Sequence, residues 1–301
     1  MIQDDLISVI SRLHTVDGDA MHLLGRMLLS LYGSSHELIQ PVVVTQGFSA
    51  EDLQKVKNLL NDFIWSESVE PKVVNFEPLS KGDYRAALIN LGIGSANGRF
   101  LALLDYDDYV YEHAYETLIK KLRSSRSAVA FGGCRASYAE ATIHGYKQTF
   151  KDMPWSGKTL DDFLADNIFP PVSFVIDRTK VDPSVLHVDE RLTRLEDYYL
   201  LLRLRAVSTF DMTYFETPLC EYIIRQDGTT TAQLGAGQDT LANQRCWEFS
   251  RKIITPLRLS LQKLRGLPNE TLDTLATHAL EKKAMAEQSA NFGKTSSNQL
   301  T

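Results

Sequence analysis

The chain has 301 residues, of which 44% are hydrophobic and 23% are charged, as in an ordinary globular protein. This composition excludes wholesale disorder, a collagen-like repeat and a coiled-coil rod, and the length suffices for one large α/β domain or two small ones. Because 32 Lys and Arg stand against 38 Asp and Glu, the net charge is -6, and we expect no general binding to nucleic acid.

The cysteines and the first residues of the chain indicate a cytoplasmic protein. Cys134, Cys220 and Cys246 are far apart and odd in number, which predicts neither a disulfide framework nor a zinc site. The chain starts with the acidic segment MIQDD, whereas a secretory signal starts with basic residues. No apolar run approaches the ~18 residues that span a bilayer.

The first third of the chain alternates between strand-like and helix-like segments. Strands are expected at apolar and β-branched runs, and helices where apolar residues recur every three or four positions behind a polar cap such as Asp17, Asp19 or Ser49. In chain order we expect strand 6–13, helix 17–32, strand 41–44, helix 50–63, strand 72–76, helix 84–96 and strand 100–104. This alternation predicts an α/β fold with a Rossmann-like, mostly parallel central sheet that is flanked by helices.

The alternation becomes irregular after residue 131, and a substrate-specific insertion would lie at 137–169. We expect helix 111–122, strand 128–131, a hairpin and loop over 137–169 with a short helix at 160–165, strand 172–176, helix 195–206 and a closing pair of strands at 210–215 and 219–224. The chain looks helical from 239 onward and ends in a polar stretch, 288–301, that we expect to be frayed.

Three carboxylates, Asp105, Asp107 and Asp108, directly follow the strand at 100–104. Ligands of parallel sheets bind beyond the carboxyl ends of the strands, which is where this acidic cluster lies. Carboxylate oxygens suit Mg²⁺ or Mn²⁺, and Mg²⁺ usually takes one or two of them and leaves its other positions to water and phosphate. The cluster therefore predicts a metal site for a nucleotide diphosphate; the alternative is a polar turn that caps the helix after it.

Two groups of residues resemble the motifs of family 2 glycosyltransferases, which have the GT-A fold. The first group is RAALIN at 85–90, GI at 92–93, A-x-GRF at 96–100 and LLDYDD at 103–108, similar to A-L-N-x-G-I, A-x-G and L-D-x-D-D in that family. The second group is VDERL at 188–192 and LEDYYLLLRL at 195–204, similar to F-D-E and E-D-x-x-L-x-x-R-L. The resemblance covers about residues 6–224.

The resemblance implies metal-dependent, inverting transfer of a sugar from a nucleotide-sugar donor to a glycan, lipid-linked or other hydroxyl acceptor, in polysaccharide or glycan biosynthesis. It places Asp108 and Asp107 at a Mn²⁺ or Mg²⁺ ion, and Asp105 and Asp107 beside the nucleotide. Arg85 and Arg225 are candidate partners of the phosphates, because guanidinium groups match phosphate oxygens, although each is a surface arginine by default.

The second group of residues contains the candidate catalytic residues. The resemblance implies that Asp197 is the base that takes the proton of the acceptor hydroxyl, with Glu196 beside it. Glu196 would raise the pKa of Asp197 and a helix N-terminus would lower it, so the balance stays open. Without the resemblance, the two residues are first-turn acids that complement the helix dipole.

The resemblance also divides the chain into a GT-A catalytic domain and a C-terminal extension. Trp155 and Asn167 lie in the variable region that shapes the sugar and acceptor pockets of relatives. The expected parts are the catalytic domain 1–238, with a nucleotide-binding half 1–110 and an acceptor half 111–238, and the helical extension with its flexible tail 239–301.

Two loops depart from the family pattern. SRLH at 11–14 replaces P-x-Y-N, and TQGFS at 45–49 replaces the acidic D-D-x-S whose Asp commonly reads a uracil edge, so a UDP-sugar is favoured only weakly among the donors. The altered loops leave an alternative, a non-catalytic domain that binds a nucleotide-sugar or a partner. A sugar-nucleotide nucleotidyltransferase is a further alternative, but its Gly-rich first loop is missing.

The segment 245–265 is basic within an acidic protein, with six Lys and Arg against Glu248 alone. Interleaved apolar residues predict an amphipathic helix that Pro256 would break or kink. Such a helix would hold the enzyme at the inner membrane face, near lipid-linked acceptors, or would pack on the catalytic domain.

Overall fold

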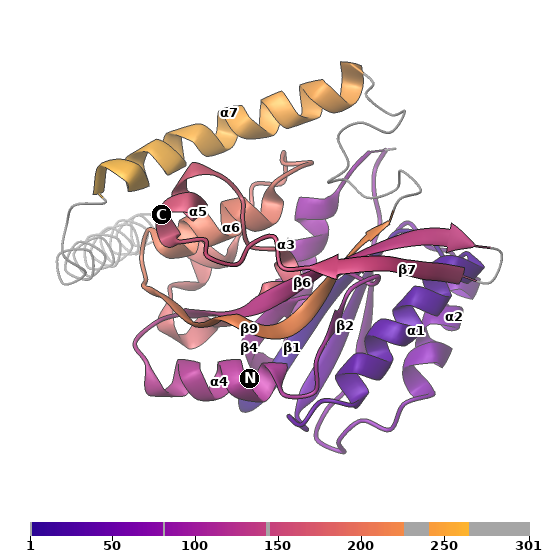
Figure 1. Cartoon of the computed structure of the whole chain (residues 1–301). Coiled ribbons are helices and arrows are strands. Elements are labelled where there is room, and N and C mark those ends of the chain that lie inside the picture. Colours follow the sequence, from indigo (N-terminus) through magenta and orange to yellow (C-terminus); the bar gives the residue numbers. More distant parts are fainter. Residues whose placement is uncertain (1, 81, 143–144, 226–240, 265–301) are drawn as a thin grey trace, which may run out of the picture.

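The centre of the structure is a nine-stranded sheet in the order β3-β2-β1-β4-β8-β6-β9-β5, with β7 paired to β6 (Figure 1). The computed structural model describes residues 2–80, 82–142, 145–225 and 241–264. The predicted tail 288–301, Arg265 and the loop that follows Arg225 lie outside these residues. The strands are β1 Gln3–Leu13, β2 Ile39–Gln46, β3 Lys72–Phe76, β4 Gly98–Leu103, β5 Tyr109–Val110, β6 Val129–Thr142, β7 Gly145–Asp152, β8 Phe174–Asp177 and β9 Phe210–Arg225.

The structure describes seven α-helices, and the first two begin at the predicted N-cap residues Asp17 and Ser49. The Asp17 side chain accepts a hydrogen bond from the Ala20 N–H at 2.8 Å, and Ser49 accepts one from the Asp52 N–H at 3.2 Å, so both satisfy N–H groups that a helix start leaves free. The helices are α1 Gly18–Tyr32, α2 Ala50–Asn61, α3 Arg85–Ser95, α4 Ala114–Ser124, α5 Leu160–Ala165, α6 Glu196–Arg205 and α7 Leu241–Leu264.

The sheet separates two hydrophobic clusters. Successive side chains of a strand point to opposite faces, and β4 shows the consequence: Leu101 and Leu103 pack in the cluster with α3 and α6, whereas Phe100 and Ala102 pack in the cluster with α1 and α4. The prediction of an α/β sheet flanked by helices is therefore confirmed.

The parallel half of the sheet positions the candidate site. β1 pairs in parallel with both β2 and β4, and β2 pairs in parallel with β3, so the chain builds outward from β1 on one side and then returns to its other side. Such a reversal of strand order opens a crevice at the carboxyl ends of the two strands concerned. Here these strands are β1 and β4, which end at Leu13 and Leu103.

The predicted closing pair of strands is wrong, because residues 210–225 form one strand, β9. It pairs in parallel with β6, and its register shifts where Gly133 pairs with Pro218. A Cβ atom on Gly133 would lie 2.6 Å from the Phe215 and Thr217 carbonyl oxygens, so the missing side chain lets the irregular part of β9 approach β6. The interruption around Pro218 is thus an irregularity within one strand and not a turn between two.

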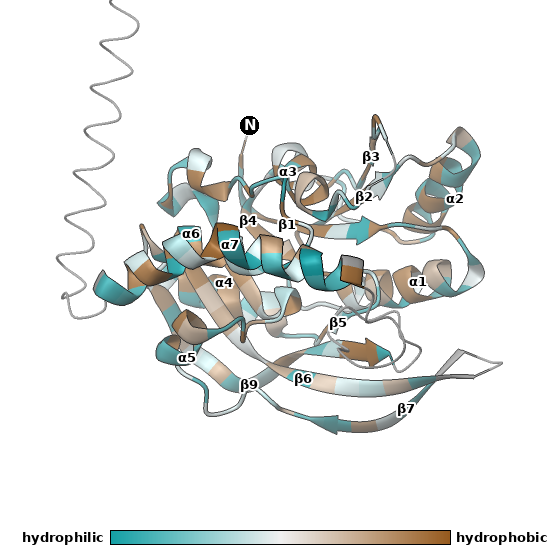
Figure 2. Ribbon diagram, turned by 90° about the horizontal axis from the view of Figure 1, so that it is seen from above, coloured by the Kyte–Doolittle hydropathy of each residue, from teal (hydrophilic) through white to brown (hydrophobic). Residues whose placement is uncertain are grey.

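Helix α7 packs on the rest of the structure, over α5 and α6 (Figures 1 and 2). Ile254 and Leu261 are buried, and Arg258 Nη1 donates to the Ala165 carbonyl at 2.8 Å. The helix continues through Pro256, so the expected break is wrong; Pro256 and Lys252 are exposed, and water can satisfy the carbonyl that proline leaves unpaired. None of the described helices has the length and apolar character needed to cross a membrane.

Gly92, in the predicted motif, lets α3 pack closely on β1, and this contact can be tested by substitution. A Cβ atom there would lie 2.4 Å from Cγ2 of Ile10, whereas Gly94 has open space around it. We expect Gly92→Ala to lower the free energy of unfolding by ~1–3 kcal/mol in urea titrations, because it overpacks the core. Gly94→Ala is the matched control and should raise it by up to ~1 kcal/mol. Equal effects of the two substitutions would contradict this packing.

Candidate functional site

Arg12, at the carboxyl end of β1, joins the two predicted motifs. Its Nη2 lies 2.8 Å from Oδ1 of Asp105, beyond β4, and its Nη1 lies 2.5 Å from Oε1 of Glu196, the first residue of α6. Glu196 is buried, so this ion pair is shielded from water. In the sequence, Arg12 stood out only as part of a loop that departs from the family motif. The signal that could have identified it is a basic residue at the end of one apolar strand, when a neighbouring strand ends in acidic residues.

Asp107 and Asp108 are carboxylates of the same loop; Asp108 is buried, and Asp107 is partly buried, with 17% of its side chain exposed. Asp108 Oδ1 accepts a hydrogen bond from the Ile223 N–H at 2.7 Å, and its Oδ2 is buried without a partner among the described residues. Asp107 Oδ2 lies 3.3 Å from Arg225 Nη2. Burial raises the pKa of Asp107 to about 6 against the opposing charge of Arg225. Burial, followed by the charges of Asp107 and Asp105, raises the pKa of Asp108 well above its usual value.

These carboxylates fit a divalent cation that a substrate helps to bind. Within the described residues, no group of three or more His, Cys, Asp and Glu side chains is placed to hold a metal by itself. Mg²⁺ and Mn²⁺ need fewer protein ligands when phosphate oxygens complete their coordination. Such a cation would give the unpartnered Oδ2 of Asp108 a partner. It would also offset the repulsion between the charges of Asp107 and Asp108.

Asp197 lies in the first turn of α6, in a constrained backbone. Leu195 before the helix has φ of 61°, the only positive φ of a non-glycine residue in the described parts of the chain, and such strain concentrates at functional sites. Burial and then the charge of Glu196 raise the pKa of Asp197 to about 6, against hydrogen bonds from the Tyr198 N–H and the Asn167 amide. The balance that the sequence left open therefore favours a raised pKa.

A pocket of about 310 Å³ lies beside Asp197. It contains Trp155 and Asn167 from the variable region, and Asn167 Nδ2 lies 3.3 Å from Asp197 Oδ2. It also contains Trp247 and Arg251 from α7, the segment for which the sequence left open a surface helix or a helix packed on the catalytic domain. The lining residues are Trp155, Asp166, Asn167, Ile168, Phe169, Pro170, Pro171, Leu195, Asp197, Tyr222, Trp247 and Arg251.

Tyr222 of this pocket links it to the acidic loop. Burial, and then the charges of four carboxylates, raise the pKa of the Tyr222 hydroxyl well above its usual value. The four are Asp108, Asp105, Asp107 and Asp197. Tyr222 lines the pocket together with Asp197, and the N–H of the next residue, Ile223, donates to Asp108, so β9 connects the two predicted groups of carboxylates.

The two predicted phosphate partners lie in different surroundings. Arg225 reaches Asp107, as described above. Arg85 begins α3 and pairs with Asp83, 3.0 Å from Nε to Oδ1, and Asp83 also binds Arg194 Nη1 at 2.9 Å. The structure therefore brings Arg225 to the acidic loop, whereas Arg85 pairs with Asp83.

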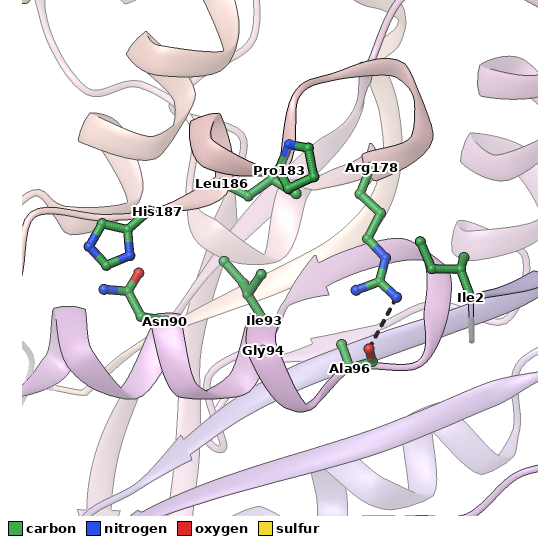
Figure 3. A pocket seen from close by; sticks show the side chains of 9 residues that line it. All are labelled: Ile2, Asn90, Ile93, Gly94, Ala96, Arg178, Pro183, Leu186 and His187. Atoms are coloured by element: carbon green, nitrogen blue, oxygen red, sulfur yellow. Dashed lines mark hydrogen bonds between the residues drawn. The ribbon is translucent and has the colours of Figure 1, made fainter. Parts of the chain in front are cut away.

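A second pocket, of about 470 Å³, lies at the opposite end of the sheet (Figure 3). Ile2 and Ala96, which line it, come just before β1 and β4 begin, and Arg178 Nη2 donates to the Ala96 carbonyl at 3.1 Å. Its lining includes no predicted site residue. The chemistry is therefore expected at the carboxyl ends of the strands.

Known proteins are similar to this chain in sequence pattern and in fold. The model of Glycosyl transferase family 2 matches residues 21–181, just over half of the chain. A search of curated proteins found no match.

The similar solved structures include TarS 1–349 from S. aureus in complex with UDP-GlcNAc, with a TM-score of 0.56, 14% identity and coverage of 91% of this chain and 71% of TarS 1–349. A second structure of TarS 1–349 has a TM-score of 0.50 and 14% identity, and covers 72% of this chain and 60% of that one. The chain spans 37% of a longer TarS structure. These similarities show the fold, which is the predicted GT-A fold.

Proposed function

Because the chain belongs to glycosyl transferase family 2, we propose that it is a metal-dependent, inverting enzyme that moves a sugar from a nucleotide-sugar donor to an acceptor hydroxyl in polysaccharide or glycan biosynthesis. The observation that carries this proposal is the arrangement around Tyr222. Asp108, held by the N–H of Ile223, and Asp107 next to it suit a cation and a diphosphate, and Asp197, which lines one pocket with Tyr222 and has a raised pKa, suits a base.

The acidic loop would bind the donor. Asp107 and Asp108 would hold Mn²⁺ or Mg²⁺, which would stabilise the charge that builds on the departing diphosphate. Arg225, next to Asp107, would contact the phosphates. Asp105, oriented by Arg12, would face the nucleoside. A UDP-sugar is the proposed donor, since the similar structure of TarS 1–349 was determined with UDP-GlcNAc.

Asp197 would accept the proton of the acceptor hydroxyl as this hydroxyl attacks the anomeric carbon. A pKa of about 6 leaves the carboxylate ionised near neutral pH yet more basic than an ordinary Asp. The Asn167 amide would orient it. Glu196, bound to Arg12, would act as a positioning residue that couples α6 to the donor loop. Direct displacement of the diphosphate would invert the anomeric configuration.

We assign residues 1–110 to donor binding and 111–238 to acceptor binding, with a glycan, lipid-linked or other hydroxyl acceptor. A cytoplasmic location stays a prediction, and so does peripheral contact with a membrane. The exposed side of α7 that would make this contact carries Phe249, Lys252, Leu259 and Lys263.

A donor screen tests the proposal. We expect the protein with Mn²⁺ or Mg²⁺ to release nucleotide from a UDP-sugar faster than from GDP- or dTDP-sugars, and EDTA to abolish the release. Coupled nucleotide assays without and with added hydroxyl acceptors measure it. Donor binding without turnover would support the non-catalytic alternative, and pyrophosphate release from a nucleoside triphosphate and a sugar phosphate would support the nucleotidyltransferase.

A further inference from the structure

The pocket beside Asp197 has a wall that the catalytic motifs do not supply. Trp247 and Arg251 lie one turn apart on α7, with the Arg251 guanidinium 5.7 Å from the centre of the Trp247 ring. The buried side chains of Ile254 and Leu261 and the hydrogen bond of Gln262 Nε2 to the Leu164 carbonyl hold the helix in place. The volume, about 310 Å³, lies at the lower end of the ~300–1,000 Å³ range of small-molecule sites.

Two side chains of this pocket have unsatisfied polar atoms. Trp247 Nε1, a donor, and Asn167 Oδ1, an acceptor, are buried and have no hydrogen-bond partner among the described residues. Buried polar groups of folded proteins are nearly always paired, so two exceptions in one pocket need an explanation. A ligand with several hydroxyl groups could satisfy both, and the rings of Trp155 and Trp247 offer apolar faces for a sugar.

Arg251 adds a charge to the pocket. It is exposed, and no ion pair involving it occurs within the described parts of the chain. Asp166 and Asp197 line the same pocket, but neither pairs with Arg251, and the Asp166 carboxylate accepts the Asn167 N–H at 2.9 Å. An unpaired guanidinium at a sugar-sized pocket is suited to a phosphate or carboxylate group.

We propose that α7 completes the acceptor site and that the acceptor is a sugar or polyol carrying a negative charge, which Arg251 binds. This inference rests on the glycosyltransferase activity proposed above, because it takes Asp197 as the base and hence the pocket next to it as the place of the acceptor. Trp247 and Asn167 then bind acceptor hydroxyl groups, and Arg251 selects the anionic group.

Binding of three probes tests the inference: methyl glucoside, glucose 6-phosphate and methyl glucuronide, titrated by ligand-observed NMR in the presence of UDP and Mg²⁺. We expect at least one anionic probe to bind more tightly than methyl glucoside, and Arg251→Gln to weaken that probe about tenfold. The phosphate and carboxylate probes show which group is recognised. Lys252→Gln is the matched control, because it removes the same charge from the next, exposed position outside the pocket.

Anionic probes that bind no more tightly than methyl glucoside, or equally to Arg251→Gln, would overturn the inference. If the wild-type protein at the same time releases nucleotide from a donor, only the inference fails; if it releases none from any donor, the proposed function fails as well. Trp247→Phe keeps the aromatic ring and removes the N–H, so it should weaken all three probes. Unchanged affinity of that variant would overturn the role given to Trp247.

Discussion

Asp197→Asn is expected to lower the turnover number by ~10² to 10⁴ while donor and metal still bind, because it removes the proposed base and keeps its size. The amide oxygen can still accept the Tyr198 N–H, which the carboxylate accepts at 2.8 Å. The start of α6 should therefore be preserved. Single-turnover kinetics and UDP calorimetry separate the two effects.

The pH dependence of turnover gives this prediction a second readout. Only ionised Asp197 can take a proton, and its pKa is raised to about 6, so wild-type turnover should fall about tenfold per pH unit below that value at saturating metal and donor. Asp197→Asn should lack this limb. Asp166→Asn, which removes another carboxylate of the same pocket, is the control and should keep it. Near-normal turnover of Asp197→Asn, or a product with retained anomeric configuration, would reject the mechanism.

Asp108→Asn is expected to weaken metal-dependent binding of UDP by at least ~10²-fold, because it replaces the unpartnered carboxylate oxygen with an amide that is a poor ligand of a hard cation. The remaining oxygen can still accept the Ile223 N–H, so β9 should keep its place. Calorimetry with UDP in the presence and absence of Mn²⁺ measures the loss.

Stability without metal separates this effect from misfolding. Because the pKa of Asp108 is raised in the folded protein, its ionised form opposes folding at neutral pH, and removing the charge should not lower the free energy of unfolding. Asp19→Asn, at an exposed position in the first turn of α1, is the control for a changed charge. Unchanged metal-dependent affinity of Asp108→Asn would remove this residue from the site.

Local patterns in the sequence were sufficient to predict the parallel half of the sheet and the helices that connect its strands. β-branched runs and capped apolar periodicity depend on residues a few positions apart, so they predicted the strands from β1 to β4 and the helices between them. Because ligands of parallel sheets bind beyond the carboxyl ends of the strands, the acidic cluster that follows β4 was expected to lie at a ligand site. The family motifs likewise located Asp197 at the start of α6.

Only the tertiary structure decided which distant side chains meet. Arg12 and Glu196 are 184 positions apart, and no local pattern joins them, yet the ends of β1 and α6 bring them into one ion pair. Packing of Ile254 and Leu261, and not the charge of its segment, placed α7 beside the pocket and brought Arg251 to it. Such contacts depend on how whole elements pack, because burial is shared among many residues and is not encoded in the spacing of any few.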